Sequence, residues 1–146
     1  MSDPVRVAFV CVQNAGRSQM STAFAERERE HRELGDEVEV LTGGTHPAEG
    51  VHEEVVEVMA EAGFDLSDRT PRTITTAELE SCDYVATMGC STLDLDADAS
   101  RVDVRDWALE DPDGQDLDAV REIRDEVEAR VSALFDGIER EVTANV

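Results

Sequence analysis

The sequence predicts an α/β protein with an open four-stranded parallel sheet and helices on both of its faces. Short apolar runs alternate along the chain with segments in which apolar residues recur every three or four positions. Strands that alternate with helices pair in parallel and are covered on both faces. The 146 residues, 40% of them hydrophobic, are enough for a single core, so we expect one domain over residues 1–146.

The first half of the chain predicts two strands, each followed by a helix. The run 5–11 is continuously apolar at its centre, as in a buried parallel strand, and ends at a cysteine. Helical periodicity follows over 18–34, and we expect Gly35 to end that helix. Val38, Val40 and Leu41 form a second predicted strand, which Gly43 and Gly44 close, and 51–60 a second helix.

The second half predicts a short helix, two strands and a long final helix. Thr75 and Glu78 have the spacing of a capping box, so a short helix should begin there. Residues 84–88 and 101–105 are predicted strands. Apolar residues at intervals of three or four over 117–142 predict a long amphipathic helix.

Several chemically interesting residues follow the ends of these strands. Cys11 ends the first strand, Gly44 the second, Cys90 follows the third, and Asp111 lies a few residues beyond the fourth. Sites in open α/β sheets form beyond the carboxyl ends of the strands. We therefore expect these residues to share one edge of the sheet.

The charge of the chain is strongly acidic. There are 35 Asp and Glu against 13 basic residues, all of them arginine, for a net charge of -22. Such a charge disfavours binding to nucleic acid and to anionic membranes. The composition without lysine resembles that of proteins from salt-accumulating halophiles, in which concentrated salt screens the self-repulsion of an acidic surface.

The remaining features indicate a cytoplasmic enzyme without a metal or cofactor. No run approaches the roughly 20 apolar residues of a transmembrane helix, and the N-terminus does not resemble a secretory signal. Cys11, Cys82 and Cys90 are an odd number, which favours reactive thiols over a disulfide framework. The acidic stretch 94–105 lacks the glycine and the final glutamate of a calcium loop.

The segment between the first strand and the first helix has the form Cys-x5-Arg-Ser. Five intervening residues let the backbone curl around one tetrahedral oxyanion with its amides pointing inward, aided by the helix N-terminus. The same field stabilises a thiolate at Cys11, and Arg17 can hold two oxygens of the anion. The predicted substrate-binding residues are Val12, Gln13, Asn14, Ala15, Gly16, Arg17 and Ser18.

Three residues of this loop have expected supporting roles. Asn14 could hold the loop in shape through side-chain hydrogen bonds. Gly16 should relieve the backbone where the loop becomes a helix. Ser18 is placed either to cap the helix or to donate a hydrogen bond to the Cys11 sulfur.

The segment 9–20 closely resembles the low-molecular-weight protein tyrosine phosphatase superfamily, and within it the arsenate reductase branch. The resemblance continues through 42–49, 63–67, 83–90 and 106–112, in the family's order. It implies the family's four-stranded parallel fold and an oxyanion substrate, arsenate or phosphate. It also implies that Asp111, before a proline, is the general acid.

Two features favour arsenate over a phosphotyrosine. Phosphatases of this superfamily typically carry aromatic residues just after that proline, whereas Asp113, Gly114 and Gln115 follow Pro112 here. Arsenate reduction also needs a second thiol, and Cys90 should lie close to Cys11 if the sheet has the family's strand order. Cys82, roughly 25 Å from Cys90 across the third strand, should lie at the opposite edge.

This chain therefore departs from members of the branch that use three cysteines in a relay. We expect a low-molecular-weight thiol or a redoxin to complete the cycle. Two alternatives stay open. One is a phosphatase that hydrolyses phosphate monoesters through a phosphorylated Cys11, and the other is a non-catalytic oxyanion sensor, which would not need Asp111.

Overall fold

The computed structural model describes residues 4–11, 13–44, 46–88, 103–107, 109 and 114–144. Within them the chain forms, in order, β1 (Val5–Cys11), α1 (Arg17–His31), β2 (Val38–Gly44), α2 (Glu53–Glu61), α3 (Thr76–Glu80), β3 (Tyr84–Met88), β4 (Asp103–Asp106) and α4 (Leu117–Ala144). The predicted α/β fold is confirmed.

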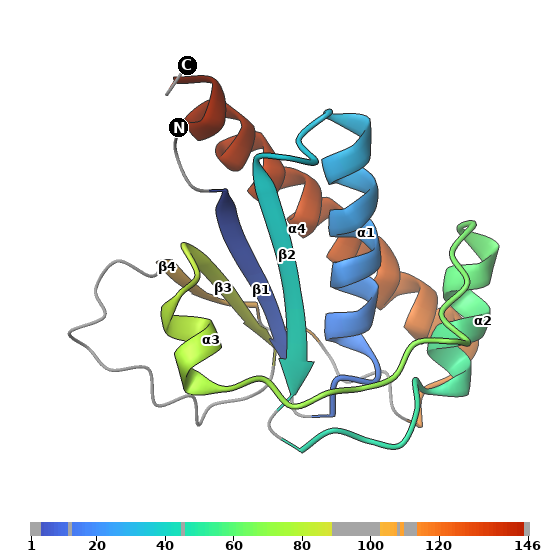
Figure 1. Cartoon of the computed structure of the whole chain (residues 1–146). Helices are drawn as coiled ribbons and strands as arrows, with labels where there is room; N and C mark the ends of the chain where they lie inside the picture. The colour runs from blue at the N-terminus through green and yellow to red at the C-terminus, as the bar shows by residue number, and fades with distance from the viewer. Residues whose placement is uncertain are drawn as a thin grey trace.

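The four strands form one parallel sheet in the order β2-β1-β3-β4. Cys11 is the last residue of β1 and pairs with Gly44 of β2 on one side and Met88 of β3 on the other. The arrowheads of β1, β2 and β3 meet at one edge of the sheet, where α1 also begins (Figure 1). The ends of these three strands, which we expected to share one edge of the sheet, are thus adjacent in space.

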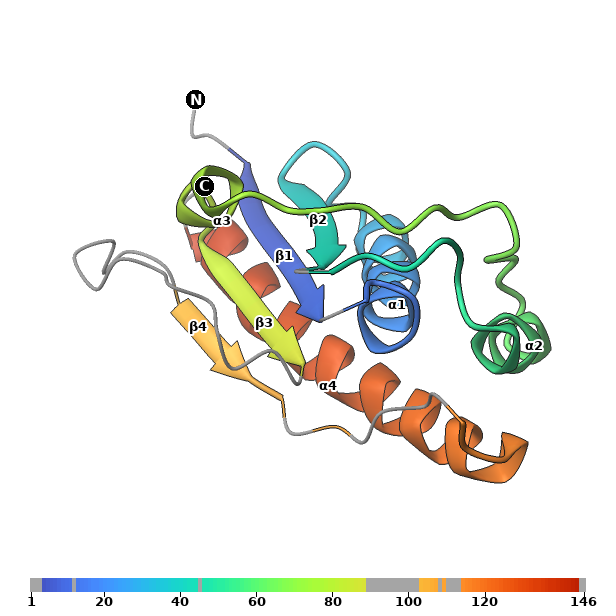
Figure 2. The ribbon, with the colours of Figure 1, turned by 90° about the horizontal axis from the view of Figure 1, so that it is seen from below.

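Alternate residues of β1 serve two apolar layers. Val7 and Phe9 belong to a large core formed with α1, α2 and α4, whereas Ala8 and Val10 belong to a smaller one. The smaller core includes Leu79 of α3. Helix α4 runs along one side of the sheet and α3 lies on the other (Figures 1 and 2). None of the helices among the described residues combines the length and apolarity needed to cross a bilayer.

Most predicted element boundaries are confirmed within two residues, but the end of α1 is not where the sequence placed it. The helix ends at His31, and the residue with a left-handed backbone is Glu33, with φ 56°, rather than Gly35. The Leu34 amide donates to the Arg29 carbonyl at 2.8 Å, which closes a Schellman motif. Burial of Leu34 in the core accompanies this early turn.

The ends of the other elements follow from local residues. Gly63 follows α2 with φ 91°, a conformation that glycine adopts without strain. The capping box of α3 is formed, since the Thr75 side chain accepts from the Glu78 amide while the Glu78 carboxylate accepts from the Thr75 amide. Of the predicted strand 101–105, residues 101 and 102 lie outside the described residues, and β4 covers Asp103–Asp106.

Candidate active site

Cys11 lies at the carboxyl end of β1 and is buried, with 3% of its surface exposed. Among the residues that the structure describes, two hydrogen-bonding groups contact its sulfur. The Asn14 amide donates to Sγ at 3.1 Å, and the Ser18 hydroxyl lies 2.8 Å away. Hydrogen bonds donated to a sulfur favour its thiolate form, because they stabilise the negative charge.

The Asn14 side chain constrains the hydrogen bonds that Ser18 can make. Its Oδ1 accepts from the Arg72 amide at 3.0 Å, so its Nδ2 must be the atom that faces Ser18 and Thr42, each at 2.8 Å. The Ser18 oxygen therefore accepts from Asn14, which leaves its own proton available to Cys11; a Cys11 thiolate has no proton and can only accept that bond. Of the two expected roles for Ser18, donation to the sulfur is the one the structure supports.

Asn14 also carries the conformational strain of the loop. Its φ is 52°, in the left-handed region, which costs an asparagine about 1 kcal/mol or more. Gly16, expected to relieve the backbone where the loop becomes a helix, is the N-cap of α1, with φ -138° and ψ -97°. Asn14 keeps its conformation because its side chain is buried and bonded on every side, with Gln19 and Thr42 among its partners.

The carbonyl groups of three consecutive loop residues point out of the loop. The Gln13 carbonyl accepts from the Ala48 amide, that of Asn14 from the Gln19 side chain, and that of Ala15 from the His52 amide, all at 2.9–3.0 Å. In a trans peptide the N–H points opposite to the C=O, so the amides of the following residues are turned inward. The Asn14 amide, which contacts the Cys11 sulfur, demonstrates this direction.

The amides of Ala15 and Gly16 have no acceptor among the described residues, although both residues are buried. The first amides of α1 add donors that no helical carbonyl can use. Such a ring of inward N–H groups at a helix N-terminus is an anion-binding nest. The loop can thus hold an oxyanion beside the sulfur.

Arg17 begins α1 and is 9% exposed. Its Nη1 donates to the Leu109 carbonyl at 3.0 Å. Leu109 is two residues before Asp111, and Trp107 fixes the start of this segment by donating its amide to Thr87 at 2.8 Å. The arginine of the loop is therefore joined directly to the segment that carries the predicted general acid.

Some predicted site residues lie outside the described residues. These are Val12, Cys90 and Asp111. The structure nevertheless describes residues close to Cys90 and Asp111 in the sequence. Met88, two residues before Cys90, pairs with Cys11 across the sheet. The roles proposed for Cys90 and Asp111 stay predictions.

Cys82 lies at the opposite end of the sheet, as expected. It comes two residues before Tyr84, which pairs with Val7, so it is about 20 Å along the strand direction from Cys11. Its sulfur donates to the Glu78 carbonyl at 3.3 Å, and burial raises the pKa of its thiol to about 11. A neutral, buried thiol at this distance takes no part in chemistry at Cys11.

The comparisons with known proteins agree with this geometry. The model of the family described as low molecular weight phosphotyrosine protein phosphatase matches residues 6–144. The chain belongs to this family. The resemblance of the Cys-x5-Arg loop thus extends over nearly the whole sequence.

Named relatives within the phosphatase family include arsenate reductases. A protein of Halobacterium salinarum named putative arsenate reductase is 75% identical over 90% of this chain and 91% of its own length. A glutaredoxin arsenate reductase of Synechocystis is 33% identical over 89% of this chain and 95% of its own. Both alignments span most of each protein.

Solved structures give the same picture. A thioredoxin-dependent arsenate reductase of Corynebacterium glutamicum superposes with a TM-score of 0.74 at 32% identity, covering 97% of this chain and 65% of that longer one. An arginine phosphatase of Geobacillus stearothermophilus, at 22% identity, has a TM-score of 0.81 over 98% of both chains. The second likeness shows the fold alone.

Several contacts that shape this phosphatase-family loop were not predicted from the sequence. They are the Thr42 hydroxyl, the Arg72 amide, the Gln19 side chain and the Leu109 carbonyl. Thr42 carried a signal, since it is a polar residue in a strand expected to end beside Cys11. Among the described residues, no cluster of His, Cys, Asp or Glu could hold a metal ion.

Proposed function

We propose that this protein reduces arsenate to arsenite, with the Cys11 thiolate as nucleophile. The observation that carries the proposal is the Cys11 loop, in which two donated hydrogen bonds favour the thiolate and inward amides surround the space beside it. The named relatives at 75% and 33% identity support arsenate as the oxyanion. An inorganic oxyanion also needs no aromatic side chain to stack against, and none stands directly after Pro112 in the sequence.

In the first step the Cys11 sulfur attacks arsenic and forms an S–As bond. One As–OH bond breaks, and the departing hydroxyl takes a proton from Asp111 and leaves as water. Arg17 and the loop amides balance the charge of the remaining oxygens. Arsenic is still As(V) after this step, because no electrons have been transferred.

In the second step the Cys90 thiolate attacks the Cys11 sulfur. An S–S bond forms and the S–As bond breaks, with its electron pair staying on arsenic, which leaves as arsenite, As(III). The two thiols supply the two electrons. The pairing of Cys11 with Met88, close in sequence to Cys90, supports this assignment.

The disulfide between Cys11 and Cys90 must then be reduced by an external thiol. Cys82 cannot act in a relay, because burial raises the pKa of its thiol to about 11 and it lies at the far end of the sheet. We propose a low-molecular-weight thiol or a redoxin as the electron donor. The glutaredoxin and thioredoxin named in two relatives support the second kind.

Hydrolysis of phosphate monoesters is the alternative that the family's description favours. It needs Cys11, Arg17 and Asp111 but no second thiol, because water releases the phosphate from Cys11. Purified protein in molar salt, given arsenate with thiols or a redoxin and, separately, p-nitrophenyl phosphate, tests both. We expect arsenite production; hydrolysis of the ester with no arsenite under any donor would establish the alternative instead.

Cys90→Ser separates the two chemistries in one protein. It should eliminate multiple-turnover arsenate reduction and leave any hydrolysis of p-nitrophenyl phosphate intact. Cys82→Ser is the matched control and should change neither. In wild type without external thiol, arsenate should produce a Cys11–Cys90 disulfide, which peptide mass mapping detects. Sustained reduction by Cys90→Ser with a small thiol would instead show that this thiol attacks the Cys11 adduct directly.

A further inference from the structure

Gln19 lies outside the Cys-x5-Arg-Ser motif but contacts its most constrained residue. It is the third residue of α1 and is 3% exposed. Its Nε2 donates to the Asn14 backbone carbonyl at 3.0 Å and to the Asn14 Oδ1 at 3.1 Å. Both partners are acceptors, so the amide nitrogen, and not the oxygen, must face them. Both protons of this nitrogen are used on one residue.

The bond to the backbone carbonyl has a consequence for the neighbouring peptide. Because the peptide is planar and trans, holding the Asn14 carbonyl toward α1 turns the Ala15 amide to the opposite side. The preceding peptide shows the same arrangement, since the Ala48 amide holds the Gln13 carbonyl and the Asn14 amide points to the Cys11 sulfur. The Ala15 amide has no acceptor among the described residues.

We propose that Gln19 is a positioning residue that aims the Ala15 amide at the bound oxyanion. It touches neither the sulfur nor the anion and acts through the Asn14–Ala15 peptide. The inference rests on the proposed function in one respect, that the loop binds an oxyanion. In this proposal a side chain of α1 sets the orientation of one donor of the loop, the Ala15 amide.

The other contacts of Asn14 make this role separable from thiolate formation. Without Gln19, the Asn14 side chain still bonds to Ser18, to Thr42 and to the Arg72 amide. Ser18 therefore keeps its hydrogen bond with Cys11. Loss of Gln19 should weaken oxyanion binding while leaving the reactivity of the free thiolate close to that of wild type.

The test uses Gln19→Met, which keeps the shape without a donor, and Gln19→Glu, which places acceptors against acceptors. Iodoacetamide alkylation of Cys11, followed by peptide mapping in molar salt, is measured against increasing arsenate and phosphate. We expect both variants to need about tenfold more oxyanion for half protection, the effect of one lost bond to a charged group. The rate without oxyanion should hardly change. In turnover, KM for arsenate should rise more than kcat falls.

Thr22→Val is the matched control, because Thr22 is also buried in α1 but, among the described residues, its hydroxyl bonds only to the Ser18 carbonyl of the same helix. It should retain wild-type protection. Wild-type protection in a folded Gln19 variant, an equal loss in Thr22→Val, or unfolding of both Gln19 variants in molar salt would overturn the proposal. If wild type itself is protected by neither oxyanion, the proposed function fails instead.

Discussion

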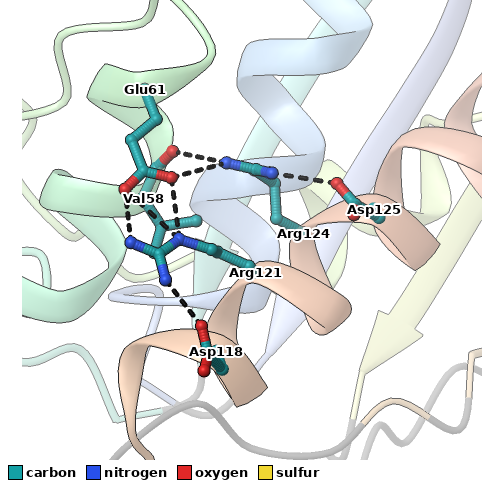
Figure 3. Close-up of polar contacts among 6 residues, drawn as sticks. All are labelled: Val58, Glu61, Asp118, Arg121, Arg124 and Asp125. Carbon is teal, nitrogen blue, oxygen red and sulfur yellow. Dashed lines mark hydrogen bonds and ion pairs between the residues drawn. The ribbon is translucent and has the colours of Figure 1, made fainter.

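The Cys11 loop and the contact between α2 and α4 are both held by dense polar networks, but the two networks differ in kind. At the second contact, Glu61 of α2 accepts from Arg121 at 2.7 Å and from Arg124 at 3.2 Å, both on α4 (Figure 3). Further bonds complete what we call the Glu61 cluster, which consists of Glu61, Val58, Asp118, Arg121, Arg124 and Asp125. The loop instead uses amides, hydroxyls and backbone groups around one buried asparagine.

The difference matters in a chain with a net charge of -22. The Glu61 and Arg121 side chains are 38% and 36% exposed, so solvent and salt screen their attraction. Hydrogen bonds between neutral, buried groups act at contact distance and do not weaken in this way. The network around Asn14 is therefore built from interactions that are insensitive to salt, whereas the ion pairs of the surface are weakened by it.

The substitution with the largest expected effect on activity removes the sulfur of the loop. Cys11→Ser should abolish arsenate reduction and any ester hydrolysis, because a serine hydroxyl in this place is not ionised near neutral pH. Arsenite release and p-nitrophenol release are the measurements. The melting temperature in molar salt should stay close to that of wild type, since the serine is of similar size. Residual turnover above a few percent would refute the role of Cys11.

Asn14→Ala should have the next largest effect. It removes every side-chain bond of the loop centre and leaves an alanine in the left-handed region, which together should cost about 2–4 kcal/mol of stability. We expect alkylation of Cys11 by iodoacetamide to be slower than in wild type, because the Asn14 side chain no longer holds Ser18 against the sulfur. Asn14→Gly separates the causes, since it relieves the strain without restoring the bonds. Fast alkylation in Asn14→Gly would mean that the network around Asn14 does not support the thiolate.

Lowering the salt concentration should affect the stability of the fold more than the reactivity of Cys11. The screening length grows from about 3 Å in 1 M salt to about 10 Å in 0.1 M, so repulsion among the 35 acidic residues increases. We expect the melting temperature to fall steeply, with loss of folded structure near 0.05 M. While the protein remains folded, the alkylation rate of Cys11 should change little. Equal melting curves in both salts would contradict the halophilic interpretation.

Glu61→Gln should have the smallest effect. The hydrogen bond from Arg121 holds the pKa of Glu61 below its ordinary value of 4.5, so the ionised form is the one that stabilises the fold. That contribution is present at neutral pH and is lost as the pH falls from 4.5 through the lowered value. The melting temperature of the variant should be slightly lower than wild type at pH 7 and equal to it in acid.

Glu57→Gln is the control for this change, because Glu57 lies on the same helix and forms no ion pair within the described part of the chain. It removes the same charge and should not lower the melting temperature. A similar decrease in both variants would assign the effect to helix α2 and not to the Glu61 cluster.

The sequence by itself determined the order and type of the elements and the composition of the loop. Periodicity, the capping box at Thr75 and the run ending at Cys11 are local signals, and each is confirmed. The position of Cys82 also followed from strand geometry alone. The predicted end of α1 was wrong, because burial of Leu34 favoured a left-handed backbone at Glu33 over one at Gly35.

Only the tertiary structure decided how the loop is held. Thr42 and Arg72 are 28 and 58 residues from Asn14, and Leu109 is 92 residues from Arg17, so no local pattern links them. Two of these contacts use backbone groups, which any residue type supplies and which therefore leave no mark in the sequence. The direction of the Ser18 proton likewise depends on which way the Asn14 amide faces, and the Arg72 backbone, brought there by the packing of the chain, sets that orientation.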